Sequence, residues 1–204
     1  MNKRLVLSLT AGVLVAGVLA APSALAALSK GTAAPAFTAQ ASKDGKAFEI
    51  SLAGALKQGP VVVYFFPSAY TGGCDVEAHA FATEAAKFEA AGATIIGVSA
   101  DSIQRLNAFS ADPNFCAGKF PIASDPEGKI AASYDLKMQA AVPGAKDVRG
   151  EVIDHGFISR TTFVIDRDGK IAAVFSSEAD HLHPQDHVAK SLATVEQLQG
   201  KKAP

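Results

Sequence analysis

Residues 61–74 have the sequence VVVYFFPSAYTGGC, in which an apolar run gives way to a short polar segment. A continuous apolar run of this length, closed by a proline, is typical of a buried strand. Residues 75–90 are rich in alanine and end shortly before Gly92, which is typical of a helix and its stop. The stretch therefore predicts a strand, a loop and a helix, with Cys74 in the first turn of the helix.

Cys74 occupies a position where a thiol is expected to react. The first turn of a helix has unpaired backbone N–H groups and the positive end of the helix dipole. Both features favour the thiolate over the thiol, and the thiolate is the nucleophilic form of cysteine. The alternative is a small cysteine buried at a strand–helix junction.

The same stretch resembles a known active-site loop. Pro67, Thr71 and Cys74 give the pattern Pro-x-x-x-Thr-x-x-Cys after an apolar strand, and Glu77 follows three residues later. This pattern resembles the catalytic loop of the peroxiredoxins, enzymes that reduce hydroperoxides with a cysteine. Within the family, the arrangement of thiols is most similar to the peroxiredoxin Q, or bacterioferritin-comigratory, branch.

A second motif lies far downstream in the order that the family has. Residues 160–166, with the sequence RTTFVID, are similar to the strand that delivers the catalytic arginine of peroxiredoxins, here Arg160. The resemblance extends from about residue 30 to about residue 198. It implies a thioredoxin-like α/β fold, with a central mixed sheet flanked by helices.

The resemblance also implies a role for each residue of the site. The Cys74 thiolate attacks one oxygen of a peroxide and becomes a sulfenic acid, without any cofactor. Thr71 orients the peroxide, Arg160 stabilises the thiolate and the developing oxyanion, Pro67 shields the sulfur, and Glu77 holds Arg160. Taken singly, each polar residue has a simpler interpretation: Thr71 as a helix cap, Arg160 as an edge-strand surface residue and Glu77 as an acid near the helix dipole.

The chain has two cysteines, Cys74 and Cys116. An even number in an exported protein suggests a disulfide, either as a permanent bridge or as a redox-active pair. We favour the redox pair, because one of the two lies at a helix N-terminus. Cys116 is predicted at the end of the helical region after residues 94–99. There it resembles the resolving cysteine of peroxiredoxin Q, which closes an intramolecular disulfide.

Closing that disulfide has consequences for dynamics and partners. A disulfide requires Cα atoms within about 7 Å. A cysteine in the first turn of one helix and a cysteine on another helix are expected to start farther apart, so both segments are expected to unfold locally in each cycle. A thiol reductant protein, similar to thioredoxin or glutaredoxin, must then reduce the bridge. A monomer is favoured over a dimer, because an intramolecular resolving cysteine does not need a partner chain.

The N-terminus is predicted to be a cleavable signal peptide, residues 1–26. Lys3 and Arg4 precede an apolar segment, residues 5–20, and Ala24-Leu25-Ala26 fits the small-x-small cleavage rule. An uncleaved membrane anchor is the alternative, although the apolar segment is short for a span of roughly 20 residues. The sequence thus predicts a bacterial periplasmic protein.

Residues 27–204 suit one domain with a substantial core. Loss of Lys3 and Arg4 with the signal changes the formal charge from −1 to −3. Without a basic block, nucleic acid and anionic membrane surfaces are not expected as partners.

Further strands are predicted at residues 48–52, 94–99 and 120–125, and further helices at 52–57, from Asp101 or Ser102 to 109, at 129–134 and at 184–198. Residues 160–166 and 170–175 alternate around Asp168-Gly169, a strong hairpin signal. Residues 138–156 are predicted to be a long surface loop with a short strand at 152–153, which could shape access to the site.

Two other classes of protein remain open. A thioredoxin-fold thiol–disulfide oxidoreductase would usually carry Cys-x-x-Cys, but here Glu77 stands at the second position. An exported metal carrier would use His181, His183 and His187, since imidazole binds copper or zinc. The alternative for these histidines is a polar loop that leads into the last helix.

Overall fold

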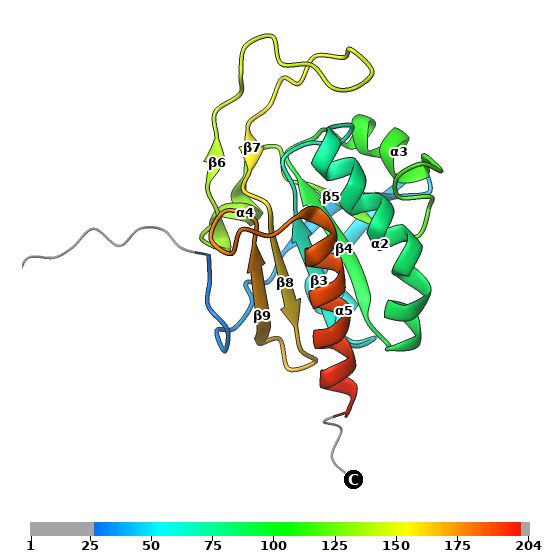
Figure 1. The fold of residues 1–204 in the computed structure, drawn as a ribbon, viewed down its shortest axis with the longest axis vertical. Helices are drawn as coiled ribbons and strands as arrows, with labels where there is room; N and C mark the ends of the chain where they lie inside the picture. Colours follow the sequence, from blue (N-terminus) through cyan, green and yellow to red (C-terminus); the bar gives the residue numbers. More distant parts are fainter. Residues whose placement is uncertain (1–26, 201–204) are drawn as a thin grey trace, which may run out of the picture.

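The apolar run 61–66 forms an interior strand of the sheet, β3 (Val61–Phe65), and every residue of this strand is buried. The computed structural model describes residues 27–200, so the predicted signal segment lies outside the described residues. β3 is one of seven strands in a mixed sheet (Figure 1). In order across the sheet, these strands are β2 (Lys46–Ser51), β1 (Thr38–Lys43), β5 (Ile122–Ser124), β4 (Thr94–Ser99), β3, β8 (Thr161–Ile165) and β9 (Ile171–Ser176).

β3 pairs with β4 in parallel and with β8 in antiparallel orientation. In the second pairing, Phe65 lies opposite Thr161. This register sets the start of β8 beside the loop that follows β3. It therefore determines which residue of the 160–166 motif lies near Cys74.

Helices cover both faces of the sheet (Figure 1). The larger layer contains α2 (Gly72–Ala90), α3 (Ile103–Ala111) and α5 (Pro184–Gly200), and the smaller one contains α1 (Leu52–Leu56) and α4 (Lys129–Ser133). Side chains alternate along β3, so that Tyr64 packs into the core under the larger helical layer and Phe65 packs into the core under the smaller one. Burying such an aromatic side chain stabilises the fold by roughly 1.5–3 kcal/mol.

The fold class predicted from sequence is confirmed, and so is the hairpin of β8 and β9. Ser102 is the cap of α3, because its hydroxyl accepts a hydrogen bond from the backbone N–H of Arg105. The sequence does not predict β1. Its residues, TAQASK, contain no large apolar side chain, and the strand is specified by its pairing with β2 and β5.

Residues 138–158 form an arm that projects beyond the end of the sheet and bends toward α2 and α3 (Figure 1). Its base is a two-stranded sheet of β6 (Met138–Gln139) and β7 (Phe157–Ile158). The prediction of a long surface loop is thus confirmed. The predicted strand at 152–153 is wrong, since Val152 makes only an isolated bridge to Lys146.

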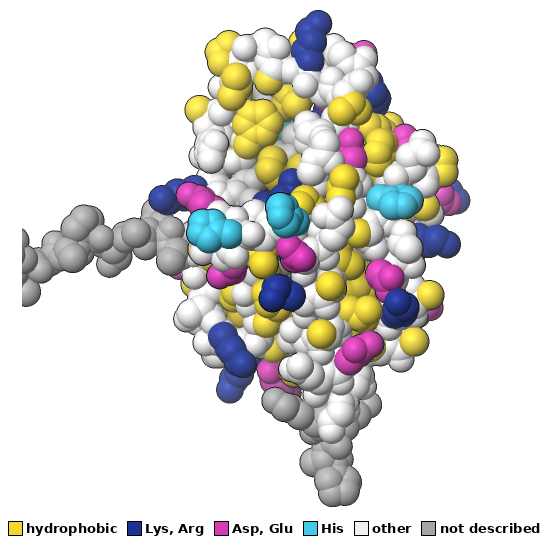
Figure 2. All heavy atoms as spheres, viewed as in Figure 1, with side chains coloured by type: hydrophobic (Ala, Val, Ile, Leu, Met, Phe, Trp, Pro, Cys, Tyr) yellow, Lys and Arg dark blue, Asp and Glu magenta, His cyan; other side chains and the backbone are white. Residues whose placement is uncertain are grey.

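The surface carries mixed charge. On the face shown in Figure 2, basic and acidic side chains are interspersed, and hydrophobic side chains gather on the arm. The exposed apolar residues of the arm include Val142, Val148 and Val152. Within residues 27–200, no helix combines the length and the apolar character that a membrane span needs.

The packing between β3 and β4 leads to a first prediction. An added Cβ at Gly97 would lie 2.8 Å from Cζ of the buried Tyr64 ring, so Gly97→Ala overpacks the core. We expect the free energy of unfolding to fall by about 1–3 kcal/mol in urea titrations. Gly200→Ala is the control, because nothing lies within 4 Å of its added Cβ. Equal stability of the two variants would contradict this account of the core.

Candidate active site

Cys74 lies in the first turn of α2, as the sequence predicts, and its side chain is buried at 2% exposure. Its backbone N–H donates to the carbonyl of Thr71, the N-cap residue of the helix, at 2.8 Å. The Thr71 hydroxyl does not cap the helix. It donates instead to the carbonyl of Ser68 at 2.7 Å, which bends the loop back on itself beside the sulfur. The interpretation of Thr71 as a side-chain cap is therefore wrong.

Arg160 immediately precedes β8 and reaches the sulfur of Cys74. Its Nη2 donates to Cys74 Sγ at 3.0 Å, and its Nη1 makes an ion pair with Glu77. The side chain is only 12% exposed, so Arg160 is not an ordinary surface residue. The antiparallel pairing of β8 with β3 brings this distant motif to the segment that joins β3 to the first turn of α2, residues 66–74, here called the Cys74 loop.

Glu77 is fully buried one turn beyond Cys74 and faces Arg160. Because α2 begins at Gly72, Glu77 is not a first-turn acid that complements the helix dipole; that position belongs to Asp75. Burial raises the pKa of Glu77 to about 7, and the Arg160 guanidinium opposes the rise. Its Oε1 has no hydrogen-bond partner within the described residues and lies 3.9 Å from Nδ1 of His187.

The ionisation of Cys74 depends on a balance between burial and charge. Burial raises the pKa of the Cys74 thiol, and Arg160 provides the largest effect in the opposite direction. Hydrogen bonding from the Ser68 backbone and from Thr71 also lowers this pKa. The helix-terminus argument predicts a lowered pKa for Cys74, and this prediction is wrong for the folded site: burial outweighs the opposing groups, so the pKa lies above its ordinary value. Arg160 is thus the main group that favours the thiolate.

Cys116 is buried and lies in a run of turns, not at the end of a helix. α3 ends at Ala111, and Pro113 follows at once, so the predicted helical end is wrong. Burial and the nearby carboxylates of Asp112 and Asp75 raise the pKa of the Cys116 thiol well above its ordinary value. Both cysteines are free thiols in this structure.

Pro67 is half-buried at the start of the loop. The next residue, Ser68, is not identified as a site residue by the sequence. Ser68 donates to Oδ1 of Asp101 at 3.1 Å, and the backbone N–H of Ala69 donates to Oδ2 at 2.8 Å. His155, from the arm, donates to Oδ1 at 2.9 Å.

Asp101 therefore anchors the Cys74 loop to the end of β4. Burial acts to raise the pKa of Asp101, but hydrogen bonding from His155 and from Ala69 outweighs it and holds this pKa below its ordinary value. In the sequence, Asp101 is a candidate helix cap beside Ser102. Only its position directly after a buried strand indicates another role.

The three C-terminal histidines do not converge on a metal site. His181 and His183 are exposed, whereas His187 is buried between the hydroxyls of Thr162 and Ser177, each 2.9 Å from a ring nitrogen. Burial lowers the pKa of His187 to about 4, so it is neutral at physiological pH. Among the described residues, no group of three metal-ligating side chains occurs.

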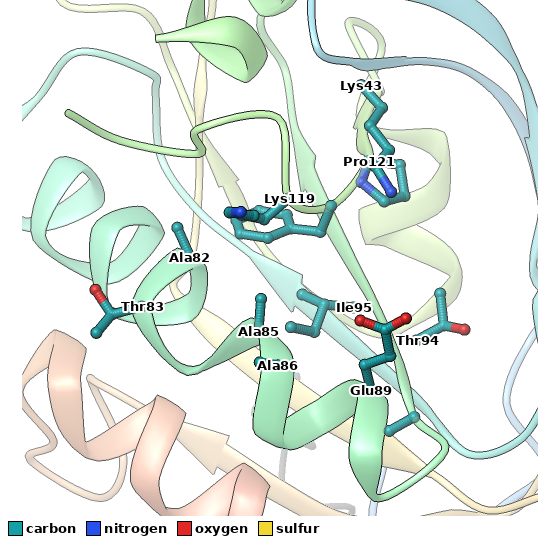
Figure 3. Close-up of a pocket in the computed structure, with 12 residues that line it drawn as sticks. Lys43, Ala82, Thr83, Ala85, Ala86, Glu89, Thr94, Ile95, Lys119 and Pro121 are labelled. Atoms are coloured by element: carbon teal, nitrogen blue, oxygen red, sulfur yellow. The ribbon is translucent and has the colours of Figure 1, made fainter. Parts of the chain in front are cut away.

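Among the cavities that the described residues form along α2, two have a volume of about 400 Å³. The first lies between α2 and β4, with Lys43, Glu89 and Lys119 at its edge, and contains none of the predicted site residues (Figure 3). The second is lined by the start of α2 and by Phe115, the residue before Cys116. The second cavity is therefore the one that adjoins both cysteine segments.

Comparison with known proteins agrees with this geometry. The model of the AhpC/TSA family matches residues 30–174. A peroxiredoxin homologue of Mycobacterium tuberculosis (strain H37Rv) is 34% identical over 69% of this chain and 80% of its own length. The chloroplastic peroxiredoxin Q of Suaeda salsa is 30% identical over 86% of this chain and 72% of its own length.

Solved structures give the same result. Peroxidoxin BcpB from Mycobacterium tuberculosis superposes with a TM-score of 0.67 at 29% identity, covering 85% of this chain and 98% of that one. The bacterioferritin comigratory protein of Xanthomonas campestris, studied for its alkyl peroxide reduction activity, gives 0.60 at 26% identity, covering 78% and 91%.

A thioredoxin-like sheet that presents a cysteine at a helix N-terminus beside a buried arginine defines a thiol peroxidase of the peroxiredoxin class. This chain belongs to the AhpC/TSA family, and its relatives support a place in the peroxiredoxin Q and bacterioferritin-comigratory branch.

Replacing Arg160 tests the electrostatic balance at the sulfur. Arg160→Met removes a charge-assisted hydrogen bond worth about 1.5–3 kcal/mol, so we expect oxidation of Cys74 by peroxide to slow by about 10- to 100-fold. The pKa of Cys74, measured from the pH dependence of alkylation, should rise. Arg167→Met, at the exposed turn after β8, is the matched control. An unchanged thiol pKa in Arg160→Met would refute this role.

Glu77 predicts a pH-dependent stability. Its carboxyl binds its proton more tightly in the folded protein, with a pKa of about 7, than in the unfolded chain. Its contribution to the free energy of unfolding therefore falls as pH rises from about 4.5 to about 7. Glu77→Gln removes this titration, so the difference in stability between wild type and variant should change across that interval. A constant difference from pH 4 to pH 8 in urea titrations would contradict the raised pKa.

Proposed function

We propose that this protein is a two-cysteine thiol peroxidase in which Cys74 attacks the peroxide and Cys116 resolves the product. The observation that supports the first assignment most directly is the 3.0 Å hydrogen bond from Arg160 to the sulfur of Cys74. A guanidinium at this distance stabilises negative charge on the sulfur, and later on an oxygen that leaves it.

In the first step, the Cys74 thiolate attacks the terminal oxygen of the hydroperoxide and the O–O bond breaks. The sulfur becomes a sulfenic acid, and the other oxygen leaves as water or an alcohol after it gains a proton. Thr71 lies beside the sulfur and its hydroxyl hydrogen can turn from Ser68 toward a peroxide oxygen. Arg160 stabilises the negative charge first on the thiolate and then on the leaving oxygen, and Glu77 holds the Arg160 side chain in place.

In the second step, the sulfur of Cys116 attacks the sulfur of Cys74 and the S–O bond breaks. The hydroxyl group leaves as water with the thiol proton of Cys116, and an intramolecular disulfide remains. Burial supports local opening as part of this step, because each cysteine lies in the core and the pKa of each thiol is raised by burial. Cys116 is fully enclosed, so it must leave its packing before its thiol can attack the sulfenic acid on Cys74.

The cavity beside the two cysteine segments supports hydroperoxides with an organic group, alongside hydrogen peroxide. Val76 and Phe115 give it an apolar lining. A thioredoxin- or glutaredoxin-like protein supplies the two electrons that restore the thiols. The active unit is a monomer, because both cysteines belong to one chain.

The periplasm is the proposed compartment. Lys3 and Arg4, the apolar segment 5–20 and Ala24-Leu25-Ala26 support export and cleavage after residue 26. In such an oxidising compartment, a dedicated thiol reductant is needed to keep Cys74 and Cys116 in turnover.

Serine variants of the two cysteines test the cycle. Pre-reduced protein is mixed with limiting hydrogen peroxide, and peroxide loss, free thiols and intact mass are followed. Cys74→Ser should abolish rapid peroxide loss. Cys116→Ser should consume one equivalent of peroxide and stop at the sulfenic acid, because no resolving thiol is present.

Three results of the same assay would contradict the proposed cycle. Negligible peroxide loss in the wild type would overturn the peroxidase proposal. Rapid loss in Cys74→Ser would instead overturn the assignment of the attacking cysteine. A wild-type product that is a sulfenic acid, without a disulfide, would exclude Cys116 as the resolving residue.

A further inference from the structure

The arm reaches the Cys74 loop and holds Tyr70 from two sides. The backbone N–H of Val148 donates to the carbonyl of Tyr70 at 3.0 Å. The guanidinium carbon of Arg149 lies 3.3 Å from the centroid of the Tyr70 ring, a close cation–π contact. Tyr70 is four residues before Cys74 and directly before Thr71. The arm thus contacts the loop at the residue before Thr71, just N-terminal to the helical turn that contains Cys74.

Tyr70 has a backbone conformation that its surroundings must maintain. Its φ is +59°, in the left-handed region that side-chain-bearing residues rarely adopt. Such a conformation persists only when neighbouring contacts enforce it. Tyr70 is 3% exposed, so the contacts with the arm and the core surround it on most sides. When these contacts are lost, the loop is expected to relax away from the folded arrangement.

The Tyr70 ring also contacts the segment of the second cysteine. Its centroid lies 5.4 Å from that of Phe115, edge to face, and 5.0 Å from that of Phe109. Phe115 is the residue before Cys116. A second link joins the same two regions, since Nδ1 of His79 on α2 lies 3.0 Å from the carbonyl oxygen of Asn114. Displacement of Tyr70 therefore loosens both cysteine segments together.

An ionic cluster fixes the arm to this position. Asp147 has a fully buried side chain and accepts hydrogen bonds from Arg149, at 2.8 Å to Nη2 and 3.0 Å to Nε. Its Oδ2 is also 2.9 Å from Nη2 of Arg105 on α3. The same Nη2 of Arg105 donates to the carbonyl of Ala69 at 2.9 Å, and its Nε lies 2.7 Å from Asp101. The arm and the Cys74 loop thus share one network.

We propose that Arg149 and Tyr70 form a latch by which the arm sets how fast the two cysteine segments open, and hence how long the Cys74 sulfenic acid survives. This inference rests on the proposed two-cysteine cycle. Both are positioning residues, because they act on the opening that lets Cys116 reach Cys74. A longer-lived sulfenic acid is more exposed to a second peroxide, which transfers an oxygen to the sulfur, gives a sulfinic acid and leaves as water or an alcohol.

Removal of the nearer of the two guanidinium groups over the Tyr70 ring, that of Arg149, tests the latch; Arg105 lies at 5.6 Å. Pre-reduced wild type, Arg149→Ala and the control Lys146→Ala are mixed with hydrogen peroxide, quenched at intervals, alkylated and weighed by mass spectrometry. Lys146 is exposed on the same arm, so its replacement removes one positive charge without touching Tyr70. Thiol, sulfenic acid, disulfide and sulfinic acid are then followed separately.

Loss of the cation–π contact predicts disulfide formation about two- to fivefold faster in Arg149→Ala, with the rate of Cys74 oxidation unchanged. Less sulfinic acid should accumulate at high peroxide. Arg149→Lys keeps a cation near the ring and should restore part of the slower rate. Lys146→Ala should match the wild type in every step.

The outcomes separate the latch from the cycle beneath it. An unchanged rate of disulfide formation in Arg149→Ala overturns the latch while the cycle stands. A change of Cys74 oxidation by the same factor also overturns it, because Arg149 would then act on the site itself. A wild type that forms no disulfide overturns the proposed cycle, and the latch with it.

A double variant tests whether Arg149 and Tyr70 act through one contact. If they do, Tyr70→Leu combined with Arg149→Ala should form the disulfide at the same rate as Tyr70→Leu alone.

Discussion

The contact of Arg160 with both Cys74 and Glu77 is the interaction on which the site depends. It joins the first two turns of α2 and the residue before β8 in one buried cluster. A cation buried beside a thiol and a carboxylate is tolerated because each partner offsets part of its loss of hydration. The register of β8 against β3 is therefore as important to the chemistry as the residues themselves.

The burial of both thiols is the opposing constraint. A fully packed site protects Cys74 from indiscriminate reaction, but the same packing raises the pKa of its thiol and of the Cys116 thiol. In the proposed cycle, the loop is therefore held in place for the reaction with peroxide and released for disulfide formation. Asp101 anchors the loop through the backbone of Ala69, and the proposed latch at Tyr70 controls its release.

Much of this could be predicted from sequence, because the relevant signals are local. An apolar strand followed by Pro67, Thr71 and Cys74 predicts the loop, the helix and the reactive position, and the structure confirms that geometry. The buried contact of Glu77 with Arg160 follows only by resemblance, since it requires a strand register. The sequence does not reveal the anchor at Asp101, because its partners lie far apart along the chain. It predicts Cys116 at the end of a helix, because the turns that hold this residue depend on tertiary contacts.

Amide hydrogen exchange of the reduced and disulfide forms tests most directly the claim that the folded site must open in each cycle. We expect much faster exchange in the disulfide form at residues 68–76 and 112–119, with β3 and β4 unchanged. The reduced form should protect both segments, since they are packed into the core. Equal protection of these segments in the two forms would contradict the account, because the disulfide would then have formed without local unfolding.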